Sequence, residues 1–118
     1  MDPVPTTVVE TPRFIRQAEG LLSEQERLEL IEHLARNPKA GVVIPDTGGV
    51  RKLRWPVGGK GKSGGARVIY FHHDESFPTF LLAMFAKNVK VDLTQEERNA
   101  IKRLVPALVQ SYQERKAR

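Results

Sequence analysis

Positively charged side chains gather in the middle of the sequence, on either side of a loop rich in glycine and lysine. No acidic residue occurs between Asp46 and Asp74. Because like charges repel, a folded protein tolerates such a cluster where the cations are solvated or meet a polyanion. The cluster therefore favours nucleic acid as a partner; the alternative is that its loop is only a soluble connection. Its members are Arg51, Lys52, Arg54, Lys60, Lys62 and Arg67.

The length and composition limit the classes of protein that this chain can belong to. Its 118 residues predict one domain, residues 1–118, with a single modest core. The net charge of +5 favours phosphate-rich partners. The absence of cysteine excludes disulfides, thiolate nucleophiles and cysteine-ligated zinc. Because no apolar run approaches ~18 residues and no signal peptide is recognisable, we expect a soluble, cytoplasmic protein.

Two helices are predicted near the N terminus, after a short β-branched strand at residues 6–10. The first spans residues 13–20, and Ser23 with Glu26 forms a capping box that begins the second. The second helix should end at Asn37, because the residue before a proline avoids the helical region. Its apolar face is expected to contain Leu28, Ile31, Leu34 and Ala35.

The remaining segments predict a sheet and a C-terminal helix. Apolar and β-branched residues mark strands at residues 42–44, 50–55, 66–73 and 79–86. Thr94 and Glu97 form a second capping box, and Pro106 should kink or interrupt the helix that follows. The fold class is therefore α+β: a small, mostly antiparallel sheet packed by an N-terminal helical hairpin and a C-terminal helix.

The expected strand pairing brings several cations together. If His73 lies opposite Thr79, Arg67 faces Phe85 and Lys87 lies diagonal to Arg67. Lys52 and Arg54 share one face of the preceding strand, so the four cations would form a basic patch that suits a phosphodiester backbone. The alternative is that Arg54 and Arg67 pair with acidic residues from a helix or the C-terminal tail.

Other kinds of site are not supported by the motifs, and we expect neither a metal nor a cofactor. His72 and His73 are adjacent on a strand and point to opposite faces, which makes a poor metal site, and His33 should be a surface residue. The loop at residues 58–63 has the composition of a phosphate cradle without the spacing of a Walker motif. No GxSxG motif indicates a serine hydrolase.

Four segments taken together resemble the RelE/HigB toxins of bacterial type II toxin-antitoxin systems, in particular the longer HigB-like branch. The similarity extends from about Phe14 to Val105. The segments are Gly49 to Arg54 (GVRKLR), Gly59 to Tyr70 (GKGKSGGARVIY), Phe85 to Asn88 (FAKN) and Asp92 to Thr94 (DLT).

The resemblance implies an endoribonuclease that cuts translated messenger RNA in the decoding site of the ribosome. It also implies a cognate antitoxin, usually with a helix-turn-helix domain, that masks the toxin and joins it in repressing their operon. By position in the family motifs, the implied catalytic residues are Lys52, Arg54, Arg67 and Lys87. Arg51, Lys60 and Lys62 are expected to bind RNA or the ribosome.

Such residues could promote attack of a ribose 2′-hydroxyl on the adjacent phosphate. Arg67 suits charge stabilisation, because its guanidinium stays protonated and presents a planar fork to phosphate oxygens. Lys52 or Lys87 could serve as base or acid, since neighbouring cations disfavour the ammonium form. The ribosome would align the RNA.

One departure from the family pattern leaves the proton-transferring residue open. Several family members use a tyrosine or histidine near the C terminus, and residues 87–94 contain neither. Tyr112 lies too far along the last helix to be matched to this role, and Tyr70 is expected in the core. Two other functions also remain open: a ParE-like toxin that binds DNA gyrase and cuts nothing, and a basic RNA-binding module without catalysis.

Overall fold

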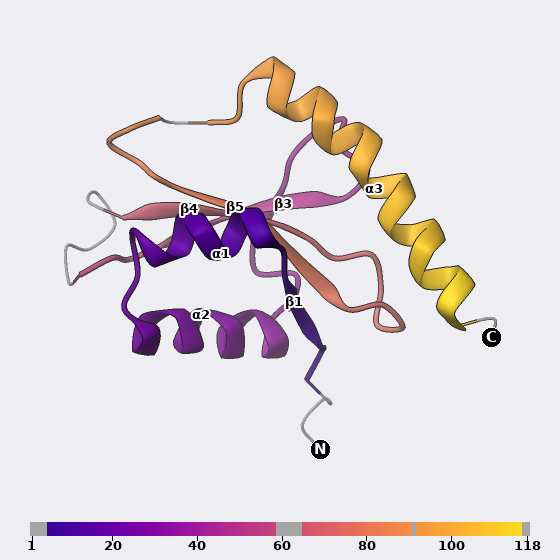
Figure 1. Ribbon diagram of the computed structural model, residues 1–118, viewed down its shortest axis with the longest axis horizontal. Coiled ribbons are helices and arrows are strands. Elements are labelled where there is room, and N and C mark those ends of the chain that lie inside the picture. Colours follow the sequence, from indigo (N-terminus) through magenta and orange to yellow (C-terminus); the bar gives the residue numbers. More distant parts are fainter. Residues whose placement is uncertain (1–4, 59–64, 91, 117–118) are drawn as a thin grey trace.

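The computed structural model describes residues 5–58, 65–90 and 92–116. Within these residues five strands form one sheet in the order β1-β5-β4-β3-β2, and three helices pack around it (Figure 1). The α+β prediction is confirmed, although the sheet is mixed, because β1 pairs in parallel with β5 while the other pairs are antiparallel. The elements are β1 (Val8–Glu10), α1 (Pro12–Glu19), α2 (Glu24–Arg36), β2 (Val42–Val43), β3 (Val50–Trp55), β4 (Ala66–Phe71), β5 (Thr79–Ala86) and α3 (Gln95–Lys116).

Helix α2 begins and ends where its local signals predict. Ser23 and Glu26 form the capping box, and Asn37 is the C-cap immediately before Pro38. The predicted apolar face of this helix is wrong at one position, since Leu28 is half exposed and the fully buried leucines are Leu30 and Leu34. These two leucines are four residues apart and therefore share one face of the helix.

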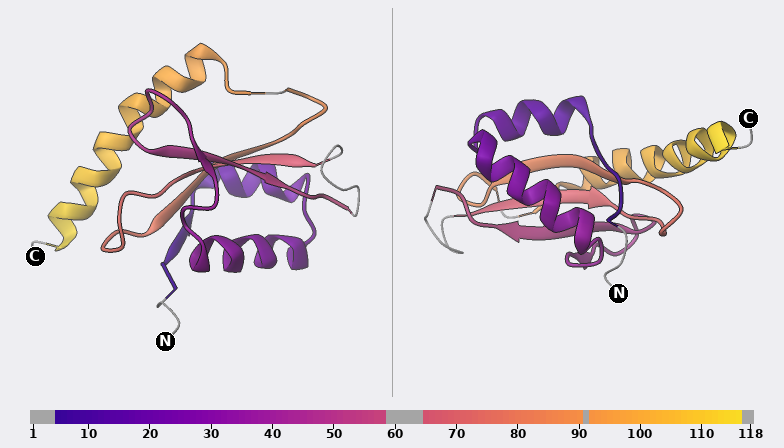
Figure 2. Two further views of the ribbon diagram at one scale, coloured as in Figure 1. Left: turned by 180° about the vertical axis from the view of Figure 1, so that it is seen from behind. Right: turned by 90° about the horizontal axis from the view of Figure 1, so that it is seen from below.

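Strand β4 lies at the centre of the fold and separates two hydrophobic clusters. Ala66, Val68 and Tyr70 pack against α1 and α2, whereas Ile69 and Phe71 belong to the cluster that contains residues of α3. This division follows from the alternation of side chains along a strand. Figures 1 and 2 show α3 diverging from α1 and α2, with its C-terminal half reaching beyond the strands.

The predicted pairing of β4 with β5 is correct over half of its length. Ala66 lies opposite Ala86 and Ile69 opposite Ala83, as expected, but a bulge between Ile69 and Tyr70 shifts the pairing by one residue. The expected pair of His73 and Thr79 is therefore wrong, and β4 ends at Phe71. The half that carries Arg67 keeps the predicted register.

Helix α3 continues through Pro106, so the predicted interruption is wrong. Proline removes one backbone donor, which frees the carbonyl four residues earlier. Both Pro106 and Lys102 are exposed, and water can therefore satisfy this carbonyl. The helix begins with the expected box, in which Thr94 and Glu97 exchange hydrogen bonds of 2.8 and 3.1 Å between side chain and backbone.

Candidate functional site

Three of the predicted cations lie on one face of two adjacent strands. Arg54 on β3 is directly opposite Arg67 on β4, and Lys52 is opposite Ile69. Residues paired in this way have side chains on the same side of the sheet, here the side that also carries the α3 cluster. We call Lys52, Arg54 and Arg67 the basic face.

Helix α3 packs on the same side of the sheet as the basic face. Its buried residues Ile101 and Val105 belong to the cluster that contains Ile69 and Phe71, and also Phe85 of β5. Arg67, which the predicted register places opposite Phe85, is confirmed in that position. At this end of the basic face Arg54 is exposed and Arg67, opposite it, is buried.

Arg67 is buried, with 8% of the residue exposed, whereas Arg54 opposite it is exposed. Within the described ranges neither Arg54 nor Arg67 forms an ion pair, and loop 59–64 contains no carboxylate. The alternative that acidic residues neutralise these two arginines therefore finds no support in the described residues.

Lys52 differs from the two arginines because it has an acidic partner. Its Nζ lies 3.4 Å from Oδ2 of Asp92, and the same oxygen accepts a hydrogen bond of 3.2 Å from Arg98. Burial opposes ionisation of Asp92, but hydrogen bonds from the Leu93 N–H and Lys52 outweigh it and lower the pKa of this carboxyl. Lys52 therefore has an acidic neighbour that the sequence analysis did not predict.

A second ion pair lies along the edge of the basic face. Lys90 donates to Glu97 at 2.7 Å, and its Nζ lies 4.9 Å from the centre of the Phe85 ring. Burial raises the pKa of Glu97, but hydrogen bonds from Lys90 and from the Thr94 backbone more than offset this and lower it. The sequence analysis missed Lys90, Asp92, Glu97 and Arg98 as neighbours of the face.

Lys87 lies immediately after β5, where the prediction places it. Its backbone N–H donates to the carbonyl of Gly65 at 3.1 Å, and Gly65 lies two positions before Arg67 in the chain. The side chain is half-buried. Lys87 is therefore a neighbour of the basic face at the end of the β4–β5 pair.

Arg51 does not join the other cations. It lies opposite Tyr70, whose side chain packs toward α1 and α2, and it donates to the carbonyls of Lys39 and Gly41 at 3.3 and 2.8 Å. These hydrogen bonds hold the loop before β2, so Arg51 has a structural role. Lys60 and Lys62, the other expected RNA contacts, lie outside the described residues.

The aromatic and imidazole groups that could move protons lie away from the basic face. The Tyr70 hydroxyl is tied into the core, accepting from the Gly41 N–H at 2.7 Å and donating to the Pro38 carbonyl at 2.9 Å. Tyr112 contacts the ring of Phe77 at 4.9 Å, and His72 is buried after β4. The titratable side chains around the face come instead from Lys52, Lys87, Lys90, Asp92 and Glu97.

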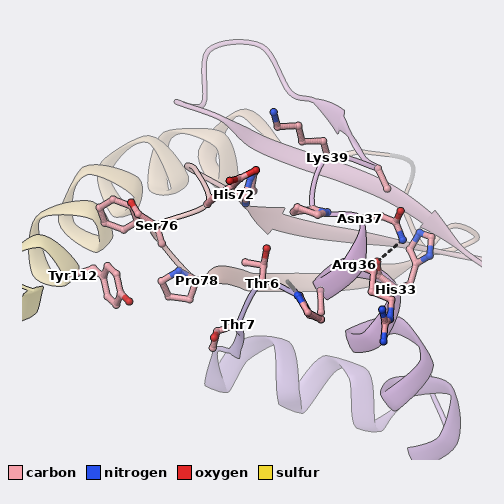
Figure 3. Close-up of a pocket in the computed structure, with 16 residues that line it drawn as sticks. Thr6, Thr7, His33, Arg36, Asn37, Lys39, His72, Ser76, Pro78 and Tyr112 are labelled. Atoms are coloured by element: carbon pink, nitrogen blue, oxygen red, sulfur yellow. Dashed lines mark hydrogen bonds between the residues drawn. The ribbon is translucent and has the colours of Figure 1, made fainter. Parts of the chain in front are cut away.

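A cavity of about 950 Å³ lies at the opposite end of β4. Figure 3 shows its walls: the segment of Thr6 and Thr7, the end of α2 near Asn37, the turn after His72, and Tyr112 on α3. His72 lies five positions after Arg67, which corresponds to roughly 17 Å of extended chain. The cavity is therefore separate from the basic face.

Neither a metal site nor a membrane span emerges from the described part of the chain. Residues 5–58, 65–90 and 92–116 contain no group of three acidic, histidine or cysteine side chains placed to hold a metal ion. Among the same residues, no helix is long and apolar enough to cross a membrane.

Comparison with models of known protein families shows to which family this chain belongs. A family model described as the RelE toxin of the RelE/RelB toxin-antitoxin system matches residues 8–117. The chain belongs to the RelE toxin family. RelE toxins form one half of a toxin-antitoxin pair, which makes this protein a toxin component. The family model covers RelE toxins as a whole, so membership of the HigB-like branch stays a prediction.

A solved RelE structure supports the same fold. The Escherichia coli toxin RelE, solved as a double arginine-to-alanine mutant in the free state, superimposes with a TM-score of 0.53 at 15% sequence identity. The match covers 73% of this chain and 87% of the E. coli chain. At this identity the similarity concerns the fold, and the chemistry has to be argued from the residues of this RelE-family chain.

Proposed function

We propose that this RelE-family toxin cleaves messenger RNA on the translating ribosome and that the basic face holds the phosphate that is cut. The observation that carries the proposal is the pair of Arg54 and Arg67, directly opposite each other and without a described acidic partner. Two adjacent cations repel each other unless an anion lies across them. A phosphodiester supplies such an anion.

The proposed reaction is an internal transfer within the RNA backbone. The 2′-oxygen forms a bond to phosphorus as the bond from phosphorus to the 5′-oxygen breaks, which leaves a 2′,3′-cyclic phosphate and a 5′-hydroxyl. A base takes the proton of the 2′-hydroxyl, and an acid returns a proton to the 5′-oxygen. Negative charge builds up on the phosphorane, and in this proposal Arg54 and Arg67 stabilise it.

Lysines are the candidates for the proton transfers. Lys52 is paired with Asp92, so it suits charge stabilisation more than proton abstraction. Lys87 has no acidic partner among the described residues and lies next to Gly65. We therefore assign Lys87 the role of acid or base. Alignment of the RNA by the ribosome would supply the remaining part of the rate enhancement.

The partners of this toxin follow from its family. We propose that a cognate antitoxin covers the basic face and that the pair, through a helix-turn-helix domain of the antitoxin, represses its own operon. The ribosome and messenger RNA are the proposed targets of the free toxin. A toxin that must enter the ribosome has to act in the cytoplasm.

Charge reversal separates RNA cleavage from the gyrase alternative. If RNA is the target, Arg67→Glu abolishes growth inhibition when the toxin is produced without its antitoxin, because the variant repels phosphate. Arg16→Glu, an exposed change on α1, serves as the control and keeps the inhibition. Growth inhibition that survives Arg67→Glu contradicts the proposal and directs attention to DNA gyrase.

A further inference from the structure

The side chain of Asp92 occupies a position between two cations from different elements. Lys52 comes from β3 and Arg98 is the fourth residue of α3, and both contact the same carboxylate oxygen, Oδ2, at 3.4 and 3.2 Å. The other oxygen, Oδ1, accepts the Leu93 N–H at 2.7 Å. Asp92 thus supplies one anionic oxygen to a pair of cations beside the basic face.

A phosphate oxygen could take the same position. The side chains of Lys52, Asp92 and Arg98 are each about a third exposed, at 37, 35 and 31%, so a ligand can reach them from solvent. Arginine and lysine both bind phosphate well, the first through its planar fork and the second as a point charge. Lys52 is two residues from Arg54 on the same strand face, about 7 Å along the strand.

The start of α3 has other attachments, so it does not depend on the carboxylate of Asp92. Leu93 is buried, and Glu97 is bonded to Thr94 and Lys90. Exposed ion pairs also contribute little to folding. An ion pair that only stabilised the fold would be expected at a less accessible position.

We propose that Lys52 and Arg98 form a second phosphodiester-binding subsite, next to the one at Arg54 and Arg67, and that Asp92 occupies it in the free toxin. On RNA binding a backbone phosphate replaces the carboxylate. This inference rests on the proposed function, because it requires RNA to reach the basic face. In the free protein Asp92 then acts as an internal competitor that weakens binding to RNA outside the ribosome.

The test compares two substitutions that remove one negative charge each. Asp92→Asn removes the competitor. Asp46→Asn is the matched control, because Asp46 pairs with Lys102 of α3, at 2.7 Å, outside the Lys52 and Arg98 subsite. Binding to a labelled single-stranded 2′-O-methyl RNA, which cannot undergo 2′-hydroxyl attack, is measured by fluorescence anisotropy at low and moderate salt.

The expected result is that Asp92→Asn binds this RNA roughly three- to tenfold more tightly than both the wild type and Asp46→Asn. Equal affinities of the two variants would overturn the inference and leave the proposed function standing if the wild type still cleaves translated messages. If no variant binds RNA and translated messages stay intact, both the proposed function and the inference are contradicted.

A second pair of variants tests the subsite from its cationic side and covers the case in which Asp92→Asn does not fold. Arg98→Gln should weaken RNA binding at least threefold. Arg103→Gln, an exposed change on the same helix, should weaken it less. Equal losses in the two variants would show that only overall charge matters and would overturn the assignment of Arg98.

Discussion

Arg54 and Arg67 lie directly opposite each other on adjacent antiparallel strands, and within the described residues neither has a carboxylate partner. Like charges in this arrangement destabilise a sheet. An anion bound between the two guanidinium groups would relieve this repulsion, which fits a surface that gains stability when a polyanion binds.

Removing one of these charges should stabilise the free protein. Arg67→Met keeps an apolar stem of similar length and relieves the repulsion, so we expect the free energy of unfolding to rise by about 0.5 kcal/mol. Urea denaturation at low salt measures the change, and Arg16→Met on α1 serves as the control. A large loss of stability in Arg67→Met would mean that this arginine supports the fold through a contact of its own.

Gly41 should not tolerate a larger side chain. A Cβ at this position would lie 2.8 Å from the carbonyl oxygen of Lys52 and 2.8 Å from the Tyr70 ring. Gly41→Ala is expected to lower the free energy of unfolding by about 1–3 kcal/mol and to reduce activity, because β3 carries Lys52 and Arg54.

Gly20→Ala is the matched control for that substitution. Its Cβ would meet only the Gln17 carbonyl at 3.8 Å, an ordinary contact. Thermal or urea unfolding should place this variant within about 0.5 kcal/mol of the wild type. Equal effects of the two alanines would contradict the close packing at Gly41.

Stability should fall in mild acid because of His72. Burial, followed by the positive charges of Arg51 and Lys39, lowers the pKa of this histidine below its ordinary value of 6.5. The unfolded chain then binds the proton more readily than the native state, so the stabilising effect of the neutral ring is complete above about pH 6.5 and is lost as the pH falls below it.

His72→Gln should therefore flatten the dependence of unfolding free energy on pH between 7 and 5.5. His73→Gln, a change at the half-exposed neighbouring position, controls for the loss of an imidazole. Urea midpoints measured across this range check the prediction. An identical slope in the wild type and His72→Gln would exclude His72 as the source of the acid sensitivity.

Local signals in the sequence were enough to predict most of the fold. Both capping boxes, the stop before Pro38 and the six buried residues of β4 follow from residue types at fixed spacing. The pairing of Arg67 with Phe85 followed from the position of the turn. The bulge, at which Leu82 of β5 has no partner on β4, could not be predicted in this way, since alternation in an apolar strand buried on both faces does not reveal an extra residue.

The site was harder to predict because its charges are paired by tertiary structure. Lys52 and Asp92 are 40 positions apart, and their contact depends on where the segment before α3 lies against β3. Arg51 belongs to the same cationic cluster in the sequence, but the alternation of side chains along β3 turns it to the other face. The spacing of cations along a strand was enough to predict the basic face, whereas its acidic neighbours can be identified only from the three-dimensional structure.

The most direct test of the central claim is to map the 5′ ends of messenger RNA in a purified translation system. The account predicts new ends at the decoding site with the wild type and with the control Arg16→Ala, only on translating ribosomes, and none with Arg67→Ala. Intact messages with the wild type, or equal cleavage by Arg67→Ala, would contradict it.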